Sequence, residues 1–338
     1  MSCEQSQKRN TAIKKAVGTS ILSKVGTLLL RLLSIPVAIE VLGMDQFGVY
    51  AAILVIVQLI DVFHVGIGPA LTQLISKAVV AGDRDKEIRS FSTGVSISAG
   101  LTVLVGSIMF AIVWFVPTSE IFGDKFLAFE DSMRRACLIA IVILGGEFLG
   151  VTIDKVRDGY METRYTNSWG AAGNFVGAGL LLFGISHFRS IEFLVIAVNG
   201  SIVAAKICNS VHLLIQRPYL IPRPATFDSS LIKPLFKGGA LLTIIYAAAA
   251  IAEYNIMTYM AGRFGGPELS GNFSIMVTLH LSAIGMIQML TIPAWPAIMD
   301  AFERGDLFWV SRTARKLRLV ALGVVFISVV GAASIGLW

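Results

Sequence analysis

Residues 18–43, GTSILSKVGTLLLRLLSIPVAIEVLG, form the stretch on which the fold prediction rests. A helix crosses a bilayer when about 20 mostly apolar residues follow one another at 1.5 Å of rise each. This stretch is long and apolar enough, yet it carries Lys24, Arg31 and Glu40. A charge near the middle of a span costs at least about 2.5–3.5 kcal/mol. Lys24 and Arg31 are seven residues apart and share one helical face, so we predict that this face looks into a polar cavity.

The composition of the whole chain is that of a polytopic membrane protein. Of the 338 residues, 55% are hydrophobic and only 15% are charged, and the mean hydropathy is +0.75. A soluble domain averages about 25% charged residues. Apolar runs recur along the whole length and leave no room for a large soluble domain. The fold class is therefore predicted to be all-α, because only helices satisfy their own backbone polar groups in a run of single spans.

The apolar runs predict about nine transmembrane helices, arranged as one six-helix bundle and part of a second. The predicted spans are 18–43, 47–65, 92–116, 136–153, 168–186, 191–215, 238–261, 271–292 and 319 onward. Residues 76–91 are expected to be a solvated, charged connection, and Pro293 and Pro296 are expected to interrupt the eighth helix. Small residues in the fifth span, Ala171, Gly173 and Gly177, permit close helix approach.

Four segments follow from this assignment. Residues 1–17 are a polar N-terminal segment, and residues 18–216 are the first six-helix bundle. Residues 217–237, with four prolines, are the linker between the bundles, and residues 238–338 are a partial second bundle of about three helices.

The positive charges predict the orientation in the membrane. Of the 28 Lys and Arg residues, 20 fall on the side of the N-terminus and 5 on the opposite side, with Lys24, Arg31 and Lys206 inside spans. Lys and Arg concentrate in cytoplasmic loops. The N-terminus is therefore expected in the cytoplasm and the protein in the plasma (inner) membrane. Because topology accounts for the net charge of +6, nucleic-acid binding is not predicted.

No enzyme signature, cofactor site or metal site is present in the sequence. The cysteines (Cys3, Cys137 and Cys208) and the four histidines lack ligand spacing. Asp83 and Asp85 lie two residues apart in GDRDKE, but alternating charges of this kind are typical of a solvated loop. We predict a protein that is not an enzyme.

Ionisable residues inside spans are the candidate functional residues, because such groups usually face a bundle interior or water. The basic candidates are Lys24, Arg31 and Lys206, and the acidic ones are Glu40, Asp61, Glu147 and Glu253. Each also has a structural interpretation: Lys24 can snorkel to the nearer interface, and Glu40 and Asp61 approach the outer one. Glu147 and Glu253 can bind a proton or serve as ion-pair partners, and Lys206 can pair with either.

Short motifs add a family resemblance. The turn Leu42–Gly48, LGMDQFG, joins the first two spans, and the second span ends with DVFHVGIG, residues 61–68. The segment AGDRDKEIRSF follows, and IPAWPAIMDAFERGDLFWV comes after the eighth span. Together these stretches resemble the polysaccharide flippases, of the O-antigen translocase type, in the multidrug/oligosaccharidyl-lipid/polysaccharide exporter superfamily. The spacing of residues 61–68 is slightly longer than the family pattern.

The resemblance implies flipping of a polyprenyl-diphosphate-linked oligosaccharide by alternating access, in the biosynthesis of a surface polysaccharide such as lipopolysaccharide. Lys24, Arg31 and Lys206 would then bind the anionic head group, with Arg suited to bidentate phosphate contacts. Glu253, Glu147, Asp61 or Glu40 would bind the coupling H⁺ or Na⁺ or pair within the cavity. The expected partners are the lipid-linked oligosaccharide, membrane lipid and a glycan polymerase machinery.

Three alternatives remain open at this point. Family members usually have about twelve to fourteen helices, so the chain resembles a C-terminally truncated member and an inactive product is one alternative. A cation-coupled drug or metabolite antiporter of the same superfamily is another, although three bases inside spans favour an anionic cargo. A membrane-embedded glycan polymerase or ligase would need a large outer loop, and the longest predicted here is only 117–135.

Overall fold

The computed structural model describes residues 3–61, 67–237, 248, 256–303 and 307–335. All of the elements in these ranges are helices, and these residues form no strand. The chain divides into two compact units, Met1–Ser274 and Ile275–Trp338.

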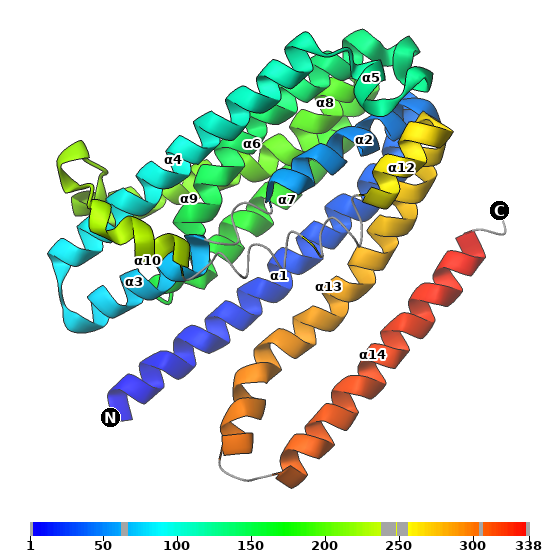
Figure 1. The fold of residues 1–338 in the computed structure, drawn as a ribbon. Coiled ribbons are helices and arrows are strands. Elements are labelled where there is room, and N and C mark those ends of the chain that lie inside the picture. Colours follow the sequence, from blue (N-terminus) through cyan, green and yellow to red (C-terminus); the bar gives the residue numbers. More distant parts are fainter. Residues whose placement is uncertain (1–2, 62–66, 238–247, 249–255, 304–306, 336–338) are drawn as a thin grey trace. The chain divides into compact units, whose positions relative to one another are not determined.

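The first unit contains most of the helices, and several of them run side by side (Figure 1). In chain order they are α1 (Cys3–Leu42), α2 (Met44–Asp61), α3 (Ile67–Ala81), α4 (Arg84–Phe115), α5 (Thr118–Phe122), η2 (Asp124–Phe129), α6 (Glu130–Gly159), α7 (Thr163–Phe188), α8 (Ile191–Val195), the π-helical turn η3 (Ile196–Gly200), α9 (Ser201–Gln216), the 3₁₀ turns η4 (Pro218–Leu220), η5 (Pro224–Thr226) and η6 (Ser229–Leu231), α10 (Ile232–Lys237) and α12 (Ile256–Gly265). Helix α13 (Pro267–Glu303) begins in this unit and continues in the second, which also contains α14 (Leu307–Ile335).

The prediction of an all-α polytopic membrane protein is confirmed. Six helices in the described part of the chain are long and apolar enough to cross a membrane: Gly18–Leu42, Arg84–Phe115, Asp124–Gly159, Thr163–Phe188, Ile191–Gln216 and Pro267–Ile287. Helix α2 contributes a shorter apolar stretch, Met44–Val55. Most of the span predicted at 238–261 lies outside the described residues, so the division into a first bundle (18–216), a linker (217–237) and a partial second bundle (238–338) stays a prediction.

Helix α7 packs on α1 and on the η3–α9 segment, and small residues line these contacts. Every fourth residue of α1 from Gly26 to Ala38 is buried. On α7 the buried positions include Ala171, Asn174 and Gly177. A Cβ built on Gly177 would lie only 2.8 Å from the carbonyl oxygen of Ala197 in η3. The predicted close approach at the small residues of this helix is therefore confirmed, since nothing larger than glycine fits there.

Residues 79–86 are exposed, as expected for a solvated connection, but most of residues 76–91 are helical and the connection is shorter than predicted. Helix α3 ends at Ala81, and Gly82 follows with a φ of +67°, which a glycine adopts without strain. Asp83 then caps α4, its side chain accepting a hydrogen bond of 3.0 Å from the Lys86 backbone N–H. Asp85 and Glu87 occupy the first turn, where acidic residues stabilise a helix N-terminus. The charges that suggest a loop are thus the signals that start a helix eight residues earlier than predicted.

Helix α13 also differs from the sequence prediction. Pro293 and Pro296 do not end it, and the helix continues to Glu303. Proline removes one backbone hydrogen bond, and membrane helices tolerate this where neighbouring groups satisfy the freed carbonyl. Similarly, α14 begins at Leu307, twelve residues before the apolar run that predicted it.

A buried hydrophobic cluster lies where α3, α4, α6 and α9 meet the short helices of residues 218–237. Its fully buried members include Leu71, Ile75, Val156, Leu213 and Leu235. The turn between α6 and α7 is at this same end of the unit, called here the α6–α7 end. The cluster fixes the C-terminal parts of α6 and α9 against each other, and these parts carry the polar side chains of the candidate site.

Candidate functional site

The predicted residues of α1 are exposed. Lys24, Arg31 and Glu40 all have exposed side chains, whereas Leu30 beside them is buried against α7. No described carboxylate lies within ion-pair distance of Lys24 or Arg31. Helix α1 therefore presents two cations that no described acidic side chain neutralises.

Arg31 has a polar neighbour on α2. The electrostatic field of its guanidinium reaches the hydroxyl of Tyr50, which is 3% exposed. The same hydroxyl hydrogen bonds the side chain of Asn199. Asn199 lies in η3, and π-helical turns occur often at functional sites because they displace side chains from the regular helical register. Three elements, α1, α2 and η3, thus bring one cation and two hydrogen-bonding groups together.

Lys206 on α9 is paired with Glu147 on α6. Its Nζ donates to Glu147 Oε1 at 2.9 Å, and both side chains are about one-fifth exposed (17% and 20%). Gly150 on α6 makes this possible, because a Cβ there would lie 2.6 Å from the Lys206 Cβ. The sequence predicts Glu147 or Glu253 as the partner of Lys206, and the described structure shows the pair with Glu147. Glu253 lies outside the described residues.

Two helical turns along α6, Asp154 meets the next polar residue of α9. Asn209 Nδ2 donates to Asp154 Oδ1 at 2.8 Å, and the Asn209 side chain is 1% exposed. Lys206, Thr166 of α7 and Asp158 also face the Asp154 carboxyl. Glu147 and Asp154 lie on the same face of α6, since seven residues are close to two turns. Polar residues thus follow one line along the α6–α9 contact.

At the α6–α7 end this line reaches a buried arginine. The Arg157 side chain is fully buried, and its guanidinium donates to Glu162 Oε2 at 3.0 Å, to Gln216 Oε1 at 3.2 Å and to the Asn209 carbonyl at 3.3 Å. It also lies over the Tyr165 ring, 4.7 Å from the centroid. An ion this deeply buried is stable only where partners replace its water. Arg157 therefore ties α6, α7 and α9 together.

Glu162 is shared by a second arginine. Arg217, just beyond α9, binds both carboxylate oxygens of Glu162, at 2.8 and 3.1 Å. Its guanidinium lies 4.0 Å from the centroid of Tyr160. Tyr160 in turn donates to Glu87 of α4 at 2.7 Å, and burial together with this hydrogen bond raises the pKa of Tyr160. Charged and aromatic side chains thus connect α4, the α6–α7 turn and the residue after α9 at the α6–α7 end.

The predicted spans 136–153 and 168–186 place Arg157, Glu162 and Arg164 in a loop, and the sequence does not indicate a role for Arg217. The apolar run of the fourth span ends at Ile153, whereas α6 continues to Gly159. A helix carried six residues further would place Arg157 one turn beyond Asp154, on the line of Glu147. The side chain of Asp61 lies outside the described part of the structure, and so does the whole of Glu253. Their predicted roles, like those of the other candidates, stay predictions.

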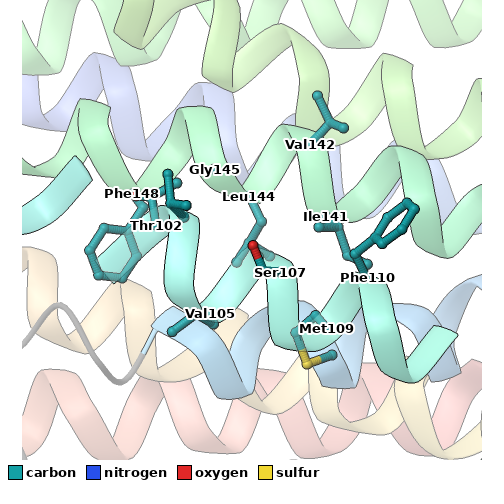
Figure 2. A pocket seen from close by; sticks show the side chains of 12 residues that line it. Thr102, Val105, Ser107, Met109, Phe110, Ile141, Val142, Leu144, Gly145 and Phe148 are labelled. Carbon is teal, nitrogen blue, oxygen red and sulfur yellow. The ribbon is translucent and has the colours of Figure 1, made fainter. Parts of the chain in front are cut away.

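A second feature of the first unit is an apolar groove of about 420 Å³ between α4 and α6. Figure 2 shows its lining side chains, among them Phe110 and Phe148, with Thr102 and Ser107 as the hydroxyl-bearing members. No ionisable residue lines it. Within the described residues no cluster of three or more His, Cys, Asp and Glu side chains is placed to hold a metal ion. The charged side chains of α1 and of the α6–α9 line therefore lie outside this groove.

Comparisons with known proteins identify the fold. No protein-family model and no curated protein sequence matches the chain. A structure described as the outward-facing conformation of a multidrug resistance MATE family transporter of the MOP superfamily matches with a TM-score of 0.66 and 14% identity, over 96% of this chain and 71% of that one. The inward-facing conformation of such a transporter matches with a TM-score of 0.63 and 13% identity, over 94% of this chain and 69% of that one.

A third match is a MOP superfamily transporter from Pyrococcus furiosus, whose description reports a binding pocket of reverse polarity that suggests a different function. Its TM-score is 0.57 and its identity 14%, over 92% of this chain and 74% of that one. Identities this low carry information about the fold alone. The chain therefore shares its fold with MATE transporters of the MOP superfamily, the superfamily whose polysaccharide flippases its motifs resemble.

Proposed function

We propose that this protein is a transporter of the plasma membrane, with its N-terminus in the cytoplasm, that works by alternating access. The likeness to both an outward-facing and an inward-facing transporter structure supports this proposal. The sequence contains no recognisable enzyme motif, which is consistent with this proposal. We further propose that residues 18–216 and 238–338 form the two bundles that move against each other, joined by 217–237.

The cargo that we propose is a polyprenyl-diphosphate-linked oligosaccharide for surface polysaccharide biosynthesis. The single observation that carries this proposal is the exposed Arg31 in the middle of the α1 span, with no described carboxylate to neutralise it. A diphosphate brings its own negative charge, and a guanidinium offers it two parallel hydrogen bonds. Lys24 lies on the same face and adds a second cation. Tyr50 and Asn199 supply further hydrogen-bonding groups beside Arg31.

The other predicted residues take the coupling role in this proposal. Lys206 is already paired with Glu147, so its charge is less available to a head group than that of Arg31. We therefore place Lys206 with Glu147 among the ion-coupling groups, together with Glu40, Asp61 and Glu253. The pocket of reverse polarity in the Pyrococcus furiosus transporter supports the idea that this fold accommodates cargoes of different charge. A cationic drug antiporter is the alternative, and an arginine without an acidic partner among the described residues would repel its cargo.

The test is transport by the purified full chain in proteoliposomes with a fluorescent polyprenyl-diphosphate-linked glycan. Arg31→Ala is expected to reduce flipping at least tenfold, while Arg31→Lys keeps part of it because the charge remains. Arg223→Ala, which removes an exposed arginine of the linker, is the matched control and is expected to transport normally. Equal flipping by Arg31→Ala and the control would remove Arg31 from the site. Export of a cationic dye, with no flipping of the glycan lipid, would favour the antiporter.

A further inference from the structure

The buried amide of Asn209 has one half of its hydrogen-bonding capacity unused. Its Nδ2 donates to Asp154 Oδ1 at 2.8 Å, but its Oδ1 is buried without a donor among the described residues. Leaving a buried acceptor unsatisfied is costly, so such an atom in a native structure calls for an explanation. The amide faces a carboxyl group, and an ionised carboxylate has no hydrogen to give.

A protonated Asp154 would supply the missing donor. A carboxylic acid and a primary amide can form two hydrogen bonds at once: the amide N–H donates to the acid C=O, and the acid O–H donates to the amide C=O. The first of these bonds is the one present between Asn209 and Asp154. The second forms when a proton arrives at Asp154 Oδ2 and is donated to Asn209 Oδ1.

The charges around the site also favour the arrival of one positive charge. Glu147 and Asp154 bring two carboxylates, whereas Lys206 brings one ammonium group, and the Lys206 Nζ lies against Glu147. The three side chains together carry an excess of one negative charge when all are ionised. An uncompensated charge within a membrane span is costly. Binding one proton removes the excess.

A metal cation is a poorer occupant of this place. Lys206 faces the Asp154 carboxyl and would repel a second full cation, in a region where low dielectric strengthens that repulsion. No cluster of three or more described His, Cys, Asp and Glu side chains is placed to hold a metal ion. A proton needs only one carboxylate oxygen and one acceptor, which Asp154 and Asn209 provide.

We propose that Asp154 is a proton-binding residue of this protein and that its bound proton is donated to Oδ1 of Asn209. The groups that face it are Lys206 and Asn209 from α9, Thr166 from α7 and Asp158 from α6. Proton binding itself does not depend on the proposed transport function; only the statement that this proton is the coupling ion rests on it. Because Asp154 lies between the Glu147–Lys206 pair and Arg157, its charge state acts directly on the line of contacts that joins α6 to α9.

The experiment is infrared difference spectroscopy of the full chain in lipid, titrated from alkaline to acidic pH without sodium. A protonated carboxyl gives a C=O band that ionised carboxylates lack. We expect one such band in the wild type and its loss in Asp154→Asn.

Glu147→Gln is expected to move the midpoint of this band to lower pH, because Lys206 would then favour the ionised Asp154 alone. Asn209→Leu should move the band to higher frequency, because the acid loses both hydrogen bonds. Glu120→Gln, an exposed acid-to-amide change, is the matched control.

The band surviving unchanged in Asp154→Asn would overturn the inference, and so would a band that responds to sodium and not to pH. These results do not involve cargo, so they are separate from the fate of the proposed function. If the wild type flips no glycan lipid but shows the Asp154 band, the proton site stands and the cargo proposal fails. If flipping is intact and equally driven by a pH gradient in wild type and Asp154→Asn, transport stands and Asp154 is not the coupling site.

Discussion

Helix α1 and the α6–α9 contact both carry charged side chains in apolar spans, but they handle the charges in different ways. Lys24 and Arg31 of α1 are exposed and have no described carboxylate as an ionic partner. Glu147 and Lys206 are hydrogen bonded to each other at 2.9 Å. Paired charges hold helices together, whereas charges without partners gain most from a ligand. The comparison therefore separates residues that support the fold from residues that can bind an anionic cargo.

The difference follows from the neighbours of each helix. The buried face of α1 is made of small and aliphatic residues such as Gly26 and Leu30, which pack on α7, whereas Lys24 and Arg31 of the same helix are exposed. Helices α6 and α9 meet through Gly150, which lets the Lys206 stem come close enough for its ammonium to reach Glu147. Similar sequence patterns thus have different outcomes because the facing helix differs.

Removing the guanidinium of Arg157 should give the largest loss of stability. Arg157→Met removes the buried donor to the Asn209 carbonyl and leaves Glu162 with Arg217 as its one remaining arginine partner. Breaking a buried ion pair costs about 3–5 kcal/mol. We expect a marked fall of the apparent Tm of the purified protein, measured by thermal unfolding in detergent. An unchanged Tm would show that the end of the unit is held together by its hydrophobic cluster alone.

Breaking the Glu147–Lys206 pair should give an intermediate loss of stability, and the single and double variants should differ in a way that identifies the pairing. Lys206→Met leaves the partly buried Glu147 without its ammonium partner, and Glu147→Leu leaves Lys206 with Asp154 as its neighbouring carboxylate. Each loss is expected to cost about 1–3 kcal/mol. The double variant removes both charges and should recover most of the stability, because two apolar side chains can replace a buried pair. A double-mutant cycle of unfolding free energies measures this coupling. Strictly additive losses would contradict a direct pairing.

The exposed cations of α1 should give the smallest effect on stability. Lys24→Gln and Arg31→Gln are expected to change the free energy of unfolding by less than about 0.5 kcal/mol, as for other exposed positions. The same two variants should differ from wild type in binding of a diphosphate lipid, measured by titration of the purified protein. A large fall in Tm for Arg31→Gln would instead place Arg31 among the structural residues and end the contrast with Lys206.

Six of the nine predicted spans correspond to candidate spans in the described part of the chain. They could be predicted because a membrane helix needs only length and apolar composition, both of which are local properties. The ends of the helices could not be predicted in this way. Asp83 and Glu87 are indistinguishable by composition from loop charges. The helix start is identified by the hydrogen bonds that the Lys86 and Glu87 backbone N–H groups donate to Asp83. The predicted fourth span ends at Ile153, because polar residues follow it. Helix α6 in fact continues to Gly159, and the contacts of Arg157 could therefore not be predicted.

The sequence alone determined that this protein is an all-helical membrane protein, and it identified residues 18–43 as a membrane span that contains ionisable residues. It determined the candidates, because an ionisable residue in an apolar run is visible without coordinates. Only the tertiary structure decided which of those charges are paired. Pairing depends on which face of one helix meets which face of another, and that is set by the small residues at each seam. The Arg31 side chain remains exposed and Lys206 finds Glu147 for this reason.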